Sequence, residues 1–174
     1  DYADEQRRVL AVNVAGIIVL NLYVPNGSEV DSDKYRYKLE WFSKLHPFIE
    51  QLLTQNERII ILGDFNIAPE DQDVHAPEEW EGKVLVSQPE RDELQKIIDT
   101  GFSDCFRLFE QAEKSFSWWD YRAAGFRRNR GLRIDHILAS DSLSGTCRKS
   151  YIDVEPRKLE RPSDHTPVVA EFEF

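Results

Sequence analysis

The sequence predicts a mixed protein of the α/β class in its α+β form, with paired strands beside amphipathic helices. Three observations point to it. Two runs rich in β-branched residues flank Ala15-Gly16, apolar residues recur at helical spacing over residues 31–56, and RIIIL at residues 58–62 is continuously apolar. These patterns are typical of a hairpin, a helix and a strand buried on both faces. Strand pairs without a regular βαβα alternation favour the α+β arrangement.

The first half of the chain carries the clearest elements. VLAVNV and IIVLNLYV form the predicted hairpin of residues 8–26. The helix over residues 31–56 has apolar residues three or four positions apart, namely Leu39, Phe42, Leu45, Ile49 and Leu52. Pro47 should kink or break this helix, because proline removes a backbone donor.

The second half is predicted from caps and short strands. Residues 68–86 form a polar loop, and Ser87 with Glu90 then makes a possible capping box. Gly101 stands where that helix should end. Residues 132–139 and 167–174 complete the pattern as two further strands.

Length and composition exclude several classes of protein. The chain has 174 residues, 41% hydrophobic and 31% charged, which suits one globular domain and not a disordered segment. No apolar run approaches the roughly 18 residues of a membrane span, and no signal peptide opens the chain, so we expect a cytoplasmic protein without a membrane partner. Cys105 and Cys147 are expected to be reduced. The absence of methionine suggests a piece of a longer protein.

Charge is unevenly distributed along the chain. The net charge is -10, and ten of the acidic residues lie between positions 64 and 93. Residues 121–133 contain no acid and five arginines, namely Arg122, Arg127, Arg128, Arg130 and Arg133. Such a patch attracts a polyanion even on an acidic protein, although a solvated basic loop would have the same composition.

Polar residues gather where predicted strands end, which is where open sheets place their sites. Asp64 and Asn66 follow the buried strand directly, in GDFN. Their oxygens suit a hard divalent cation or can orient a water molecule, but Gly, Asp and Asn are also ordinary turn residues. Asp164 and His165 form an adjacent acid–base pair before the last strand, or a turn with a surface histidine.

Three further positions have a chemical and a structural interpretation. Asp135, inside a strand-like run, could orient a histidine or could face water on an edge strand. Trp118 and Trp119 offer stacking surfaces for nucleic acid beside the arginines, although at least one of them should be core. Tyr23, at the end of the second hairpin strand, could bond a phosphate oxygen or simply pack.

In this order, the motifs NLYVPNG, GDFNIAPED, SWWDYR, RGLRID and SDHTPV resemble the exonuclease III type of apurinic/apyrimidinic endonuclease, within the endonuclease/exonuclease/phosphatase family. The resemblance runs from about residue 9 to the end. It implies a four-layer αββα sandwich of the DNase I-like type. It also implies Mg²⁺-dependent hydrolysis of phosphodiesters in duplex DNA, at abasic sites or 3′ ends, with Mn²⁺ as a second possible metal.

The resemblance assigns roles residue by residue. Asp64 matches the residue that activates the attacking water, and His165 matches the histidine at the scissile phosphate, oriented by Asp135. Asn66 and Tyr23 match groups that hold the phosphate and complete the catalytic set. The implied metal ligands are Asp64, Asn66, Asp164 and His165. The implied substrate contacts are Tyr23, Asn66, Trp118, Arg122, Arg127, Arg128 and Arg130.

Two motifs of the family, an NVNG-like strand and a QET-like strand with a metal-binding glutamate, do not occur here. We therefore expect residues 1–174 to be one domain that covers the C-terminal two-thirds of such an enzyme. The full enzyme would be a monomer, whereas this chain would expose an apolar sheet face, self-associate and bind Mg²⁺ weakly. The alternatives are a catalytically impaired fragment and a related phosphoesterase acting on RNA or a small phosphate ester.

Overall fold

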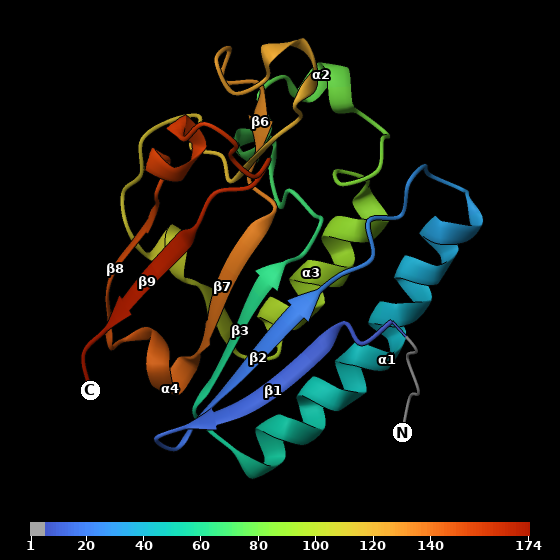
Figure 1. Ribbon diagram of the computed structural model, residues 1–174. Coiled ribbons are helices and arrows are strands. Elements are labelled where there is room, and N and C mark those ends of the chain that lie inside the picture. Colours follow the sequence, from blue (N-terminus) through green and yellow to red (C-terminus); the bar gives the residue numbers. More distant parts are fainter. Residues whose placement is uncertain (1–5) are drawn as a thin grey trace.

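The computed structural model of the protein describes residues 6–174 and is built on a central five-stranded sheet (Figure 1). The helices and strands are β1 (Val9–Val14), β2 (Ile17–Tyr23), α1 (Asp33–Gln55), β3 (Ile59–Asp64), α2 (Pro77–Trp80), α3 (Gln88–Asp99), β4 (Phe102–Asp104), β5 (Trp118–Trp119), β6 (Gly131–Leu132), β7 (Asp135–Ser140), α4 (Asp141–Ser144), β8 (Cys147–Ile152) and β9 (Val168–Phe172). Short 3-10 helices are η1 (Asp71–Asp73), η2 (Cys105–Leu108), η3 (Arg122–Ala124) and η4 (Glu155–Lys158).

The central sheet has the strand order β1-β2-β3-β7-β4, and the smaller pairs are β5-β6 and β8-β9. Only the β2–β3 pair of the central sheet is parallel. The predicted hairpin is confirmed as β1 and β2. Ala15 and Gly16 have φ angles of 51° and 83°, the left-handed pair that a tight type I′ turn needs.

Helices α1 and α3 cover one face of the sheet, where Leu20, Phe42, Ile61 and Ile97 share a core. Of the two effects predicted for Pro47, a kink or a break, the break was wrong, since α1 runs through it without interruption. Pro47 lies on the exposed side, and buried Leu45 and Ile49 pack on either side of it in sequence. That packing outweighs one missing backbone hydrogen bond.

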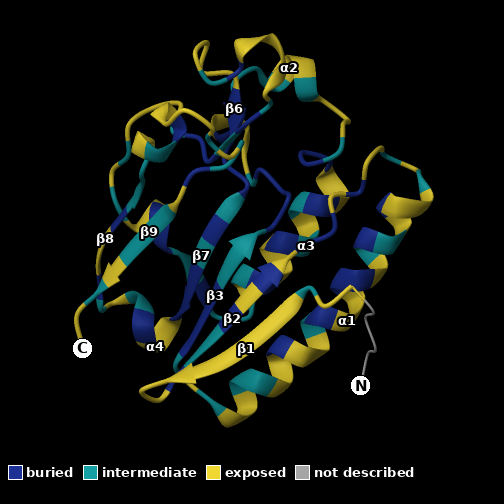
Figure 2. Cartoon of the chain, viewed as in Figure 1, coloured by how far each residue is buried: buried dark blue, intermediate teal, exposed yellow. Residues whose placement is uncertain are grey.

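The other face of the sheet packs against β8, β9 and η2, through residues such as Ile60, Cys105 and Cys147. Both cysteines are free thiols, as predicted, and both are buried. Edge strand β1 is exposed along its whole length, without such cover from residues 6–174 (Figure 2). Its residues Leu10 and Val14 keep 59% and 55% of their surface exposed. The described chain thus contributes a helix layer, a sheet and a two-stranded part of a second β layer.

Two local predictions are confirmed and one needs correction. The capping box of Ser87 and Glu90 opens α3, and Gly101, with a φ of 109°, follows its end. The single strand expected over residues 132–139 is instead two strands, β6 and β7, because the chain turns from one sheet to another at Arg133 and Ile134. Among residues 6–174, no helix is both long and apolar enough to cross a bilayer.

Candidate active site

Three predicted residues form one row across β2, β3 and β7, at the edge of the central sheet that the ends of these strands form. Tyr23 of β2 is paired in register with Asp64 of β3, and Asp64 is paired with Asp135 of β7. Residues that are directly opposite each other point to the same face of a sheet. The structure therefore brings Tyr23, Asp64 and Asp135 together from positions far apart in the sequence.

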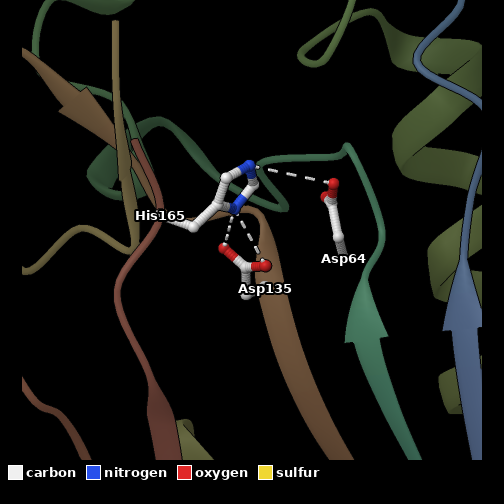
Figure 3. Close-up of side chains that lie close together, drawn as sticks. All are labelled: Asp64, Asp135 and His165. Atoms are coloured by element: carbon white, nitrogen blue, oxygen red, sulfur yellow. Dashed lines mark hydrogen bonds and ion pairs between the residues drawn. The ribbon is translucent and has the colours of Figure 1, made fainter. Parts of the chain in front are cut away.

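His165 joins this row from the loop before β9. A bridge between Trp118 and His165 fixes its backbone. Its Nδ1 lies 3.1 and 2.9 Å from the two carboxylate oxygens of Asp135, and its Nε2 lies 4.0 Å from Oδ2 of Asp64 (Figure 3). Since Nδ1 donates to Asp135, the ring is oriented with Nε2 facing Asp64.

The electrostatics of this group favour a bound cation. Burial first, and then the charge of Asp135, raises the pKa of Asp64 to about 7. For His165, burial alone would lower the pKa, but the hydrogen bond and charge of Asp135, together with Asp64, raise it. Asp64, Asp135 and His165 each offer a ligand atom, and these atoms lie within 4.8 Å of one another. Two close carboxylates form a donor set that fits a hard divalent metal.

Asn66 is tied to Asp64 through a tight turn. It has a φ of 51°, its backbone N–H donates to Oδ1 of Asp64 at 2.8 Å, and its amide donates to Oδ2 at 3.0 Å. Sequence reasoning quoted Asn26 only as part of a motif, yet its amide donates to Oδ1 of Asn66 at 2.9 Å. Asn26 follows the strand that carries Tyr23, and that position is the signal that could have identified it.

Asp164 and Trp118 lie beside the row without joining its carboxylate group. The indole N–H of Trp118 donates to Oδ2 of Asp164 at 3.0 Å. Trp118 is half-buried, whereas Trp119 belongs to the core, which confirms the prediction that at least one of the two tryptophans is core. Ser117, which sequence reasoning missed, is fully buried, and its hydroxyl accepts from the backbone N–H of Asp135 at 3.1 Å. A serine before two tryptophans carries no signal for this role.

The arginine-rich segment separates into three groups. Arg127 and Arg128 are exposed and form no ion pair within residues 6–174, Arg122 and Arg130 are exposed but pair with Asp120 and Glu79, and Arg133 is buried. The prediction that Arg133 belongs to a DNA-facing patch was wrong. Arg133 is 1% exposed and bonded to Asp73 and Asp104, because a charge folded into the core must find partners there.

This geometry agrees with a comparison of the whole chain. The pattern of the endonuclease/exonuclease/phosphatase family matches residues 1–165. The chain belongs to this family. It is similar to exodeoxyribonuclease III of Haemophilus influenzae, with 38% identity over 184 residues that cover 99% of this chain and 69% of the relative.

Solved structures extend the likeness to three dimensions. A Neisseria structure described as the 3′ phosphatase NExo bound to product DNA hairpin has a TM-score of 0.96 and 44% identity, covering 99% of this chain and 67% of that one. An AP endonuclease from Archaeoglobus fulgidus has a TM-score of 0.93 and 37% identity, covering 100% and 68%. The chain thus spans about two-thirds of the length of these relatives. The predicted family, fold and class of enzyme, a DNA-repair nuclease, are confirmed.

Proposed function

We propose that the protein hydrolyses phosphodiester bonds of duplex DNA at abasic sites and at 3′ ends, using a bound Mg²⁺ ion. The observation that carries this proposal is the row of Tyr23, Asp64 and Asp135 completed by His165. The relatives described as exodeoxyribonuclease III, 3′ phosphatase and AP endonuclease support the same class of substrate.

Asp64 and His165 have complementary roles in this proposal. Asp64 has a pKa of about 7, so near neutral pH it can accept a proton from an attacking water. His165, held by Asp135 with a raised pKa, presents a charged Nε2–H toward the same space. A phosphate oxygen placed there would receive a charge-assisted hydrogen bond that strengthens as negative charge develops.

The remaining polar groups hold the phosphate. Tyr23 is 55% exposed, and its hydroxyl makes no hydrogen bond to residues 6–174, while the Arg8 guanidinium lies 4.8 Å from its ring centre. Asn66 and Asn26 form an amide pair beside Asp64. The Asn66 amide donates its two N–H groups to Asp64 and to Val24, so the donors proposed for phosphate oxygens are the second amide N–H of Asn26 and the Tyr23 phenol, which add no charge that would compete with the metal.

The residues that would hold Mg²⁺ are Asp64 and Asp135 from the geometry, with Asn66 and Asp164 as the further predicted ligands. His165, predicted as a ligand as well, has no lone pair left for the metal when both of its ring nitrogens carry protons, so it serves the phosphate instead. When bound, the metal neutralises the charge that develops on the phosphate during hydrolysis. The proposed substrate contacts outside the row are Trp118, Arg122, Arg127, Arg128 and Arg130. An abasic nucleotide suits such a site because no base must be unstacked to extrude it.

A duplex with one tetrahydrofuran abasic analogue tests the proposal. The protein, as its gene encodes it, should cut 5′ to the analogue when Mg²⁺ is present and leave it intact in EDTA. The same duplex with a 3′-phosphate end, and a soluble inositol phosphate, separate DNA-end processing from small-molecule hydrolysis. Cleavage of the inositol phosphate alone would refute the proposal.

The oligomeric state is part of the same proposal. Residues 1–174 belong to one domain, and the exposed apolar side chains of β1 promote association of the 174-residue chain. Gel filtration should therefore show species larger than a monomer for this chain. A compact monomer that resists dilution and salt would contradict the expected association. Location in the cytoplasm stays a prediction.

A further inference from the structure

A fully buried ion pair lies directly behind the two asparagines of the candidate site. Lys38 Nζ of α1 lies 2.5 Å from Oε1 of Glu90 on α3, and both side chains have 0% exposure. Burial lowers the pKa of Lys38, and the charge of Glu90 opposes this effect. Buried ion pairs seldom stabilise a fold more than apolar residues of the same size do, so the position of this pair needs another explanation.

All three donors of the Lys38 ammonium are used. One goes to Glu90, one to the backbone oxygen of Asn66 at 2.7 Å and one to the backbone oxygen of Asn26 at 3.3 Å. Gly27 follows Asn26, and a Cβ atom there would lie 3.3 Å from Cδ of Lys38, so the chain runs close over the lysine stem. A single cation thus fixes the turns that follow β2 and β3.

The side chains of the same two asparagines meet on the site side of these turns. Asn26 donates to Asn66 at 2.9 Å, and Asn66 donates both to Asp64 and to the backbone oxygen of Val24 at 3.0 Å. A shift of either backbone oxygen rotates the peptide that carries these amides. Lys38 therefore controls the direction of the asparagine amides relative to Asp64.

The carbonyls after Asn66 are held in the same way. The oxygen of Ile67 lies 2.8 Å from Nε2 of His136, and the oxygen of Ala68 accepts from Nε of Arg91 at 3.1 Å. Arg133 can only donate to Nδ1 of His136, at 3.0 Å, which leaves the proton of the neutral ring on Nε2. Three successive carbonyls are therefore fixed from α1, β7 and α3.

We propose that Lys38, supported by Glu90, is a positioning residue that sets Asn66 against Asp64 and, through Asn66, sets Asn26 for phosphate binding in the transition state. The inference rests on the proposed function and deepens it. Glu90 suits this support because Oε1 also accepts from the N–H of Leu85 at 3.1 Å, and Oε2 accepts from the N–H of Ser87 at 3.1 Å and from its hydroxyl. The carboxylate is thus immobile and keeps the ammonium in place.

The double variant Lys38→Met with Glu90→Leu tests this role, because it replaces both charges with apolar groups of similar size. We expect the thermal midpoint to fall, because the backbone N–H groups of Leu85 and Ser87 lose their acceptor, so activity is measured well below it. There, kcat on the abasic duplex should fall about 10- to 100-fold and KM should change less than about threefold. Hydrogen–deuterium exchange of residues 64–68 should become faster than in the wild type. Unchanged kcat and unchanged exchange in the folded double variant would overturn the proposal.

Tyr35→Phe is the matched control. The Tyr35 hydroxyl lies 2.6 Å from Oγ of Ser87 in the same buried contact between α1 and α3, and it bonds neither asparagine carbonyl. Its kcat and loop exchange should match the wild type. A loss of kcat equal to that of the double variant would show that the pair only joins the helices, and would overturn the proposal.

Two outcomes are kept apart by these measurements. If the wild type does not cut the duplex, the proposed function fails, and the exchange of residues 64–68 in the double variant still decides the positioning role. If the double variant does not fold, Lys38→Gln replaces it, since glutamine has only two N–H groups for three acceptors. We then expect a kcat loss of about two- to tenfold, and an unchanged kcat would count against the proposal.

Discussion

Two regions meet at the candidate site and differ in how firmly their side chains are held. At the sheet edge, Asp64, Asn66 and His165 are each fixed by hydrogen bonds to other residues of the site. In the neighbouring segment of residues 120–130, Arg127 and Arg128 are exposed and make no side-chain hydrogen bond or ion pair with any residue from 6 to 174. We therefore propose that the rigid edge carries out the chemical step and that the segment makes adjustable contacts with DNA.

The exposed segment nevertheless packs on a buried arginine. Arg157 of η4 is 6% exposed, and its guanidinium lies 5.8, 5.7 and 5.0 Å from the ring centres of Trp119, Tyr121 and Phe126. Stacking of a buried guanidinium on several rings fixes the base of the segment. The arginines can then move while the segment keeps its place beside Trp118.

The largest expected effect comes from the rigid edge. Asp64→Asn removes the proposed base and a metal ligand, so kcat on the abasic duplex should fall by at least about 10³-fold. Duplex binding measured by fluorescence anisotropy should change less than about threefold, because the arginine segment is untouched. Asp71→Asn, an exposed acid paired with Arg91, is the control and should keep wild-type kcat. An active Asp64→Asn enzyme would refute the assignment of the base.

Asp135→Asn should have the next largest effect. Loss of the carboxylate weakens the orientation of His165 and lowers its pKa, because the hydrogen bond and charge of Asp135 raise that pKa. We expect a fall in kcat of about 10²-fold with little change in KM. Steady-state kinetics on the abasic duplex measure both constants. A variant that changed KM alone would show that His165 only binds substrate.

The pH dependence of metal binding follows from the raised pKa values. The proton on Asp64 stabilises the folded chain below the ordinary pKa of about 3.8, and this contribution is lost as pH rises through about 7. The raised pKa of His165 acts in the same direction. Mg²⁺ competes with the Asp64 proton, so its affinity should rise about tenfold per pH unit up to about pH 7 and then level off.

Thermal unfolding measures this competition. We expect 10 mM Mg²⁺ to raise the midpoint by roughly 2–6 °C at pH 8 and by much less at pH 5.5. The Asp64→Asn variant is the control and should lose most of the difference between the two pH values. An equal shift at both pH values would mean that Asp64 is not a ligand.

The rigid edge was largely predictable from sequence, whereas its support was not. Asp64, Asn66 and His165 lie in short motifs at strand ends, and strand ends can be recognised from a few neighbouring residues in the sequence. Lys38 and Glu90 are 52 residues apart, and Arg133 and Asp73 are 60 apart. A charged residue is predicted to be exposed unless its partner is known, and only the fold brings these partners together.

The same limit explains the errors at Arg133 and Pro47. Arg133 lies in the same arginine-rich stretch of sequence as the exposed arginines. It differs from them in having two carboxylates, those of Asp73 and Asp104, as partners in the fold. Pro47 has the sequence signature of a helix break, but contacts of α1 with the sheet decide otherwise. Local propensity is a weak prior where tertiary packing is extensive.

The smallest expected effect comes from the exposed segment and sharpens the comparison most. Arg127→Ala with Arg128→Ala should weaken duplex binding about three- to tenfold and reduce the slope of log K against log salt by about 2, since each lost phosphate contact removes about one released counterion. Saturating kcat should stay within about twofold. Arg148→Ala with Lys149→Ala removes the same charge from β8 and should leave the salt slope unchanged. If both double variants lower the slope equally, the DNA responds to net charge and the segment has no special role. If Arg127→Ala with Arg128→Ala also lowers kcat tenfold, the exposed arginines take part in the same chemical step as Asp64.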